Sequence, residues 1–159
     1  MTDTLCPVAR TVDRVGDAWS LMILRDAFHG LTRFDQFQKS LGVAPNILTR
    51  RLAKLVEAGM LERRRYNARP PRDEYVLTAQ GRDFWPVLVA MMAYGNRHFA
   101  REGVASQLVD VQTGAPAEPV LADAATGRRL DPAAFKFAAG PAADPAVLAR
   151  MAFADARRV

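Results

Sequence analysis

Apolar residues recur at helical spacing along the first sixty positions and predict four helices, over about 7–15, 18–28, 32–41 and 45–58. Pro7 and Pro45 suit the first turn of a helix, and Gly16, Gly42 and Gly59 mark ends. The fourth segment has the clearest stripe. Its inward positions are Ile47, Leu48, Leu52, Leu55 and Val56.

After Gly59 the period changes from about 3.6 residues to 2. Leu61, Arg63 and Arg65 alternate with polar neighbours, and residues 74–77 form the returning strand of a predicted β-hairpin. Its tip, residues 67–72, contains two prolines that stiffen the loop. A long helix over 79–101 is expected to follow.

The order of four helices, a hairpin and a long helix predicts a fold that is mainly α with a small β-hairpin wing (α+β). A pair of helices joined by a tight turn and followed by a basic hairpin is typical of a winged helix-turn-helix. The segment 45–58 would be the recognition helix, and an exposed helix whose polar face touches only water is the alternative. The wing favours the first interpretation because it supplies a second basic element.

The charge is concentrated in one part of the chain. The 159 residues include 22 Lys and Arg against 17 Asp and Glu, a formal charge of +5. Residues 41–82 contain nine basic and four acidic side chains, a difference that equals the whole net charge. Arginine dominates this set, and its planar guanidinium suits phosphate and guanine. The pattern predicts a polyanionic partner, with a merely solvated face as the alternative.

The predicted interface with double-stranded DNA has two parts. On the recognition helix, Asn46 suits an adenine edge, Thr49 a phosphate or a thymine methyl, and Arg50 a guanine or a phosphate. In the wing, arginines of the strand and of the tip would contact phosphates or the minor groove. Arg64 is instead expected to pair with Glu62 or Glu74. The predicted DNA-binding residues are Asn46, Thr49, Arg50, Arg51, Lys54, Arg63, Arg65, Arg69 and Arg72.

Several runs in residues 5–100 resemble HxlR-type transcriptional regulators, which are related to the MarR group. The runs are CPVART at 6–11, GDAWSLMILR at 16–25, RFDQF at 33–37, LTRRL at 48–52, PPRDEY at 70–75 and LTAQG at 77–81. The resemblance implies a homodimeric winged-helix protein whose first and last domain helices pair across a two-fold axis. A monomer core would use the same apolar residues.

Cys6 is the one cysteine and the one candidate for chemistry. If Pro7 starts the helix, Cys6 lies at the N-cap, where free N–H groups and the helix dipole lower a thiol pKa. The resemblance implies a redox-sensing role, since some regulators similar to this one sense quinones, aldehydes or hypochlorite there. Oxidation would join two subunits or attach a small thiol. The alternative is a small residue that starts the helix and packs against a partner.

Other chemistry has little support in the sequence. We expect no enzyme activity, because no paired carboxylates, Ser-His or Cys-His arrangement, or phosphate-binding loop occurs in a supporting context. We expect no cofactor and no metal, since His29 and His98 lack ligand spacing. No membrane-spanning run or leader is evident, which favours the cytoplasm. Four aromatic residues would line an effector pocket or simply form core: Trp19, Phe28, Phe84 and Trp85.

The composition shifts to alanine, proline and glycine after residue 103. We therefore expect a DNA-binding and dimerisation domain over 1–103 and an appendage over 104–159. Short strands at 108–112 and 118–122 are predicted to pair, followed by a helix start at Asp131 and a helix over 144–159. The context of 127–130 resembles a zinc ribbon of some HxlR relatives, but Asp123 and Thr126 occupy the ligand positions, so that site would hold no metal.

The sequence as a whole predicts a transcriptional regulator that binds a palindromic operator as a homodimer, with repression as the default. A small molecule or an oxidant would be its effector. Two other functions remain open: a sequence-tolerant architectural binder, and an adaptor that uses the winged fold to bind protein. Alanine at the wing arginines would leave an adaptor's partner binding intact.

Overall fold

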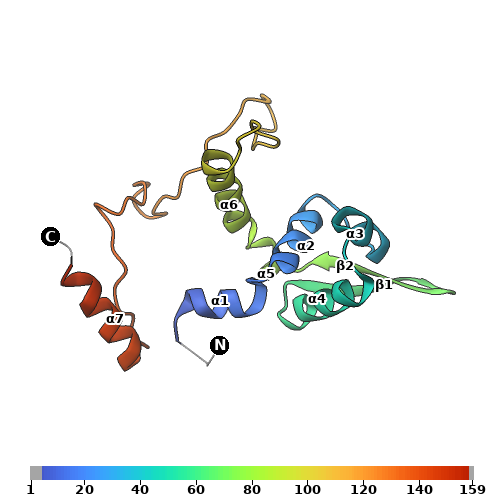
Figure 1. The fold of residues 1–159 in the computed structure, drawn as a ribbon, viewed down its shortest axis with the longest axis horizontal. Coiled ribbons are helices and arrows are strands. Elements are labelled where there is room, and N and C mark those ends of the chain that lie inside the picture. The colour runs from blue at the N-terminus through green and yellow to red at the C-terminus, as the bar shows by residue number, and fades with distance from the viewer. Residues whose placement is uncertain (1–4, 158–159) are drawn as a thin grey trace. The chain divides into compact units, whose positions relative to one another are not determined.

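The computed structural model describes residues 5–157, which form two compact units. One unit is residues 14–119, and the described parts of 1–13 and 120–159 form the other. The elements in chain order are α1 (Pro7–Val15), α2 (Ala18–Phe28), α3 (Phe34–Leu41), α4 (Pro45–Glu57), β1 (Leu61–Ala68), β2 (Pro71–Leu77), α5 (Ala79–Arg82), α6 (Trp85–His98) and α7 (Pro145–Asp155) (Figure 1).

The core of residues 14–119 lies where α2, α3 and α4 meet the base of the hairpin (Figure 1). The predicted stripe of α4 is confirmed: Leu48, Leu52 and Leu55 are fully buried. Gly42 ends α3 with a φ of +61°, a left-handed conformation that glycine adopts without strain. The turn places α4 directly after α3, which makes this pair the helix-turn-helix.

Strands β1 and β2 form the predicted antiparallel hairpin, with Leu61 opposite Leu77 at its base. The register shifts between Arg65 and Asn67, so the outer part carries a bulge. At the base, a Cβ on Gly81 would lie 2.0 Å from the carbonyl oxygen of Met60. Only glycine allows α5 to approach the start of β1 this closely, which fixes the hairpin against the helices.

The predicted long helix over 79–101 is wrong, because the structure divides it into α5 and α6. Thr78 caps α5, its hydroxyl oxygen accepting the Gly81 N–H at 2.9 Å. Pro86 lies in the first turn of α6 and has no N–H to donate back to α5, so the helix restarts there. α6 ends at His98, three residues before the predicted end.

The predicted strand pairing after residue 103 is also wrong in detail. Val109 pairs with Pro116 and Ala122 pairs with Arg129, so each strand returns on its own tight turn. In the first turn, the Asp110 carboxylate accepts hydrogen bonds from the N–H groups of Gln112 and Thr113. These bonds reverse the chain before the predicted end of the strand at residue 112.

The second turn has the same Asp-x-x-Thr-Gly pattern. Thr126 donates its hydroxyl to the Asp123 carboxylate. The helix start predicted at Asp131 makes one turn only, closed by the Phe135 N–H on the Asp131 carbonyl at 2.8 Å. The predicted terminal helix is present as α7, where the Asp144 side chain accepts the Val147 N–H.

Candidate nucleic-acid interface

Helix α4 turns a short polar face toward solvent while its leucines anchor the other face. Asn46, Thr49 and Arg50 are all exposed near its N-terminus. The Thr49 hydroxyl donates to the Pro45 carbonyl at 2.8 Å, and Asn46 Oδ1 accepts the Ile47 N–H at 2.9 Å. Within residues 5–157 the Arg50 side chain has no ion pair or hydrogen bond. It is therefore free to reach a ligand.

Arg51 and Lys54 of α4 contact the start of α2. Asp17 pairs with Arg51 Nε at 3.2 Å and with Lys54 Nζ at 4.0 Å. The same carboxylate caps α2 by accepting the N–H of Ser20 at 3.0 Å and its hydroxyl at 2.6 Å. One acidic side chain thus connects the start of α2 to α4.

The electrostatics of Asp17 reflect these four contacts. Partial burial raises its pKa, but the hydrogen bonds from Ser20 and the charges of Arg51 and Lys54 outweigh it and hold the pKa below the ordinary value. Asp17 is consequently ionised at neutral pH and keeps its ion pairs.

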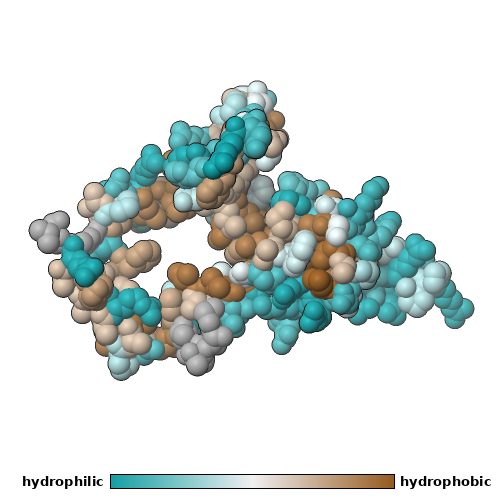
Figure 2. All heavy atoms as spheres, in the orientation of Figure 1, coloured by the Kyte–Doolittle hydropathy of each residue, from teal (hydrophilic) through white to brown (hydrophobic). Residues whose placement is uncertain are grey.

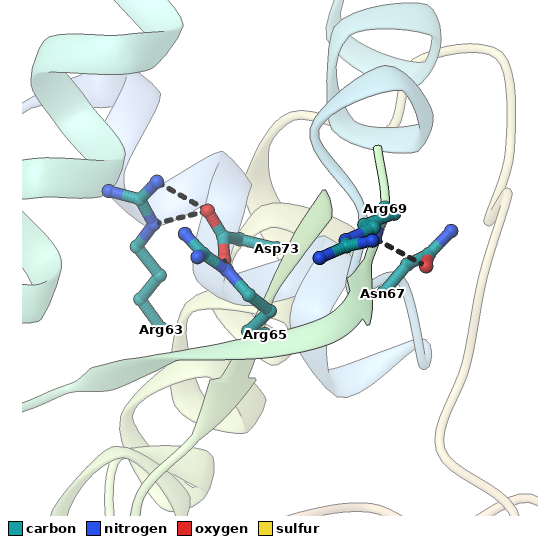
Figure 3. Close-up of polar contacts among 5 residues, drawn as sticks. All are labelled: Arg63, Arg65, Asn67, Arg69 and Asp73. Carbon is teal, nitrogen blue, oxygen red and sulfur yellow. Dashed lines mark hydrogen bonds and ion pairs between the residues drawn. The ribbon is translucent and has the colours of Figure 1, made fainter. Parts of the chain in front are cut away.

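Arg63 and Arg65 of β1 share one carboxylate on β2 (Figure 3). Arg63 Nε donates to Asp73 Oδ2 at 2.9 Å, and Arg65 Nε donates to Oδ1 at 3.2 Å. The hydrogen bond from Arg63, supported by Arg65, lowers the Asp73 pKa despite an opposing desolvation. Both guanidinium side chains remain 58% exposed. The ion pairs with Asp73 orient the two guanidinium groups, which remain accessible to solvent.

Arg64 pairs with Glu62 on its own strand, one of the two partners predicted from the sequence. The tip of the wing carries Arg69 and Arg72, both exposed. The Arg69 N–H donates to Asn67 Oδ1 at 3.2 Å, which leaves its guanidinium outside that contact (Figure 3). The wing is hydrophilic along its length (Figure 2). Its chemistry suits a phosphate backbone.

Cys6 directly precedes α1, and its carbonyl accepts the Arg10 N–H at 3.0 Å. This is the N-cap position expected from the sequence. The N–H groups of Ala9 and Val8 and the charge of Arg150 in α7 lower the Cys6 pKa, against a smaller effect of desolvation. The thiol is partly exposed.

Comparison with known proteins decides the family. The sequence pattern of the HxlR-like helix-turn-helix family matches residues 14–103. The chain belongs to the HxlR-like family. An HTH-type transcriptional regulator of Mycobacterium tuberculosis (strain H37Rv) is 40% identical over 115 residues, which are 72% of this chain and 73% of that protein.

Solved structures agree with this assignment to the HxlR-like family. A Pseudomonas aeruginosa protein described as a transcription factor (PA1374) is 50% identical, with a TM-score of 0.65 over 91% of this chain and 99% of that one. The redox regulator HypR in its oxidised form is 31% identical, with a TM-score of 0.54 over 58% of this chain and 97% of that one. The HxlR-like chain is therefore a transcriptional regulator with a winged helix-turn-helix fold.

The predicted DNA-binding residues all fall inside the matched region, and Cys6 falls outside it. The structure brings Asn46, Thr49 and Arg50 onto one face of α4 and groups the wing arginines around Asp73 or at the tip. Arg51 and Lys54 of the same helix both contact Asp17.

Two residues near this HxlR-like interface were missed from the sequence. Asp17 has a recognisable N-cap pattern with Ser20, but nothing local indicates its contact with α4. Arg33 precedes α3 and lies over the Tyr66 ring of β1 at 4.8 Å, so it adds an exposed cation where α3 meets the wing. Arg33 is the N-cap residue of α3, and its N–H donates to Gln36 Oε1 at 2.9 Å.

The described residues contain no group of three or more His, Cys, Asp or Glu side chains arranged to hold a metal. Over the same part of the chain, no helix is both long and apolar enough to cross a membrane.

Proposed function

We propose that this HxlR-like regulator represses transcription by binding a palindromic double-stranded DNA operator as a homodimer. The observation that carries the proposal is the exposed face of α4, where Asn46, Thr49 and an unpaired Arg50 project from a helix anchored by buried leucines. A recognition helix reads bases with its N-terminal residues. The basic wing supplies contacts to the backbone.

The hydrogen bonds of α4 narrow the role of each side chain. The Thr49 hydroxyl uses its one proton on the Pro45 carbonyl, so its methyl group is left to contact a thymine methyl. Arg50 keeps all its donors for a guanine edge. Asn46 reads adenine after releasing the Ile47 N–H from its amide oxygen.

The other basic residues contact the phosphate backbone in this proposal. Arg51 and Lys54 reach phosphates with the donors that Asp17 leaves free, and Arg63 and Arg65 do so while held by the wing carboxylate. The tip arginines, 69 and 72, reach flanking phosphates or the minor groove. These contacts give affinity rather than sequence preference.

Helix α6 supports the homodimer. Although most of its residues are apolar, none of them is buried within the chain. Trp85, Val87, Met91 and Tyr94 are each more than two-fifths exposed. A second copy of α6 would bury this surface, and two-fold symmetry would place the recognition helices on half-sites about 34–36 Å apart.

We further propose that an oxidant acts on Cys6, that residues 1–103 bind DNA and dimerise while 104–159 are an appendage, and that the protein acts in the cytoplasm. The lowered Cys6 pKa favours the reactive thiolate. The redox regulator HypR is a structural neighbour. With one cysteine per chain, oxidation joins two subunits or attaches a small thiol.

A selection from random DNA duplexes tests the function. We expect the full chain to enrich a palindrome whose half-sites lie about 10 base pairs apart, and light scattering to give the mass of a dimer. Enrichment of no sequence would overturn the operator proposal, and a monomer on an asymmetric sequence would overturn the dimer.

A further inference from the structure

The face of the wing that carries Arg63 and Arg65 also carries an acidic residue. Asp73 of β2 lies directly opposite Arg65 and diagonal to Arg63, whose own cross-strand partner is Tyr75. A carboxylate on a surface that contacts phosphates would by itself repel them. The burial and the hydrogen bonds of Asp73 indicate the opposite effect.

The carboxylate of Asp73 is less accessible than the two cations that it holds. Its side chain is 15% exposed, whereas the side chains of Arg63 and Arg65 are each 58% exposed. Figure 3 shows the carboxylate between the two guanidinium groups. A phosphate that approaches this face therefore meets the arginines before it meets the acid.

Asp73 occupies only part of the hydrogen-bonding capacity of the two arginines. Arg63 donates from Nε and Nη2 to Oδ2 of the carboxylate, and Arg65 donates from Nε to Oδ1. Within residues 5–157 neither side chain makes another hydrogen bond or ion pair. Nη1 of Arg63 and both Nη atoms of Arg65 therefore remain free to donate to a ligand.

Holding the two side chains in advance reduces the entropy that DNA binding costs. A surface arginine without a partner samples many rotamers and loses this freedom when it binds a phosphate. The ion pairs with Asp73 already restrict Arg63 and Arg65 in the free protein. The hydrogen bond from Arg63 holds the pKa of Asp73 below its ordinary value, so the carboxylate keeps its charge and its partners at neutral pH.

We propose that Asp73 is a positioning residue for DNA binding: it orients the guanidinium groups of Arg63 and Arg65, and DNA phosphates accept hydrogen bonds from their free Nη atoms. This inference rests on the proposed function and extends it to an acidic residue. Its sign separates it from simple electrostatics. Removal of the Asp73 charge weakens DNA binding if Asp73 positions the arginines, and strengthens binding if Asp73 only repels phosphate.

Fluorescence anisotropy of the full chain carrying Asp73→Asn, on a scrambled duplex at low salt, measures this sign. A scrambled duplex is sufficient because phosphate contacts do not depend on base sequence. We expect Asp73→Asn to bind about three- to tenfold more weakly than the wild type, since DNA must then immobilise side chains that the carboxylate no longer holds. Asp73→Glu keeps the carboxylate and should bind within about twofold of the wild type.

Glu62→Gln is the matched control. Glu62 is an acidic residue of the same hairpin, but its partner is Arg64, which lies outside the proposed interface. Its replacement removes the same charge without freeing Arg63 or Arg65. We expect Glu62→Gln to bind the scrambled duplex at least as tightly as the wild type.

A double-mutant cycle tests whether Asp73 acts through the two arginines. In a chain carrying Arg63→Gln and Arg65→Gln, Asp73 has no guanidinium group to orient, so Asp73→Asn should leave binding unchanged or strengthen it. A role of Asp73 in the fold of the hairpin alone would weaken binding by the same factor in both backgrounds. Circular dichroism and thermal unfolding check that each variant is folded.

Three outcomes would overturn the inference while the wild type binds DNA: unchanged or tighter binding by Asp73→Asn, equal weakening by Asp73→Asn and Glu62→Gln, or weakening by Asp73→Asn that persists in the double-glutamine background. Weakening by Asp73→Glu as large as that by Asp73→Asn would also count against it. Failure of the wild type to bind any duplex would refute the proposed function itself, and the inference with it.

Discussion

Replacing Arg50 by alanine separates base reading from backbone contact. Arg50 is exposed and has no partner within residues 5–157, so its removal should change the free energy of unfolding by no more than about 0.5 kcal/mol. A lost arginine–guanine pair costs about 1–3 kcal/mol on the selected operator, which is about 5- to 150-fold in Kd.

The assay is fluorescence anisotropy with the selected duplex and a scrambled one, for the wild type, Arg50→Ala and Arg69→Ala. We expect Arg50→Ala to lose most of its affinity for the operator and little for the scrambled DNA. Arg69→Ala, at the wing tip, should weaken binding to both duplexes alike. It should also reduce the slope of log K against log salt concentration by about one. The reverse behaviour of the two variants would refute the assignment of bases to α4 and of phosphates to the wing.

Three further predictions concern stability and regulation. Leu52→Ala removes a fully buried side chain of α4 and should lower the free energy of unfolding in urea by about 2–5 kcal/mol; a loss under 1 kcal/mol would contradict its place in the core. Asp17→Asn keeps the helix cap but loses two ion pairs, so it should cost about 1 kcal/mol at pH 6. Because the Asp17 pKa is lowered in the folded protein, this difference should shrink as the pH falls below about 4, and a constant difference would argue against it. Cys6→Ser should bind DNA like the wild type yet stay bound after diamide treatment, and equal release of both proteins would end the redox proposal.

The sequence predicts most of the DNA-binding fold because its signals are local. The spacing of Leu48, Leu52 and Leu55 identifies the buried face of α4, and the change of period after Gly59 identifies the hairpin. The exposure of Asn46 and Arg50 follows from the same periodicity. The burial or exposure of these side chains can therefore be predicted without the tertiary structure.

The remaining features depend on contacts between distant residues. The pair of Asp17 with Arg51 forms only when α2 packs against α4, and 34 positions separate the two residues in the sequence. Arg63 and Arg65 can both pair with Asp73 only in the strand register that places Asp73 opposite Arg65. The break before α6 was missed because the apolar pattern continues across it, although Pro86 was a visible signal.

Fluorescence anisotropy of the wild-type protein on its selected palindrome and on a scrambled duplex, each at several salt concentrations, tests base reading by α4 most directly. Because the wing contacts phosphates, we expect the affinity for both duplexes to fall steeply with salt. We also expect the palindrome to bind at least about a thousandfold more tightly than the scrambled duplex at physiological salt. Equal affinity for the two duplexes would contradict base reading by α4.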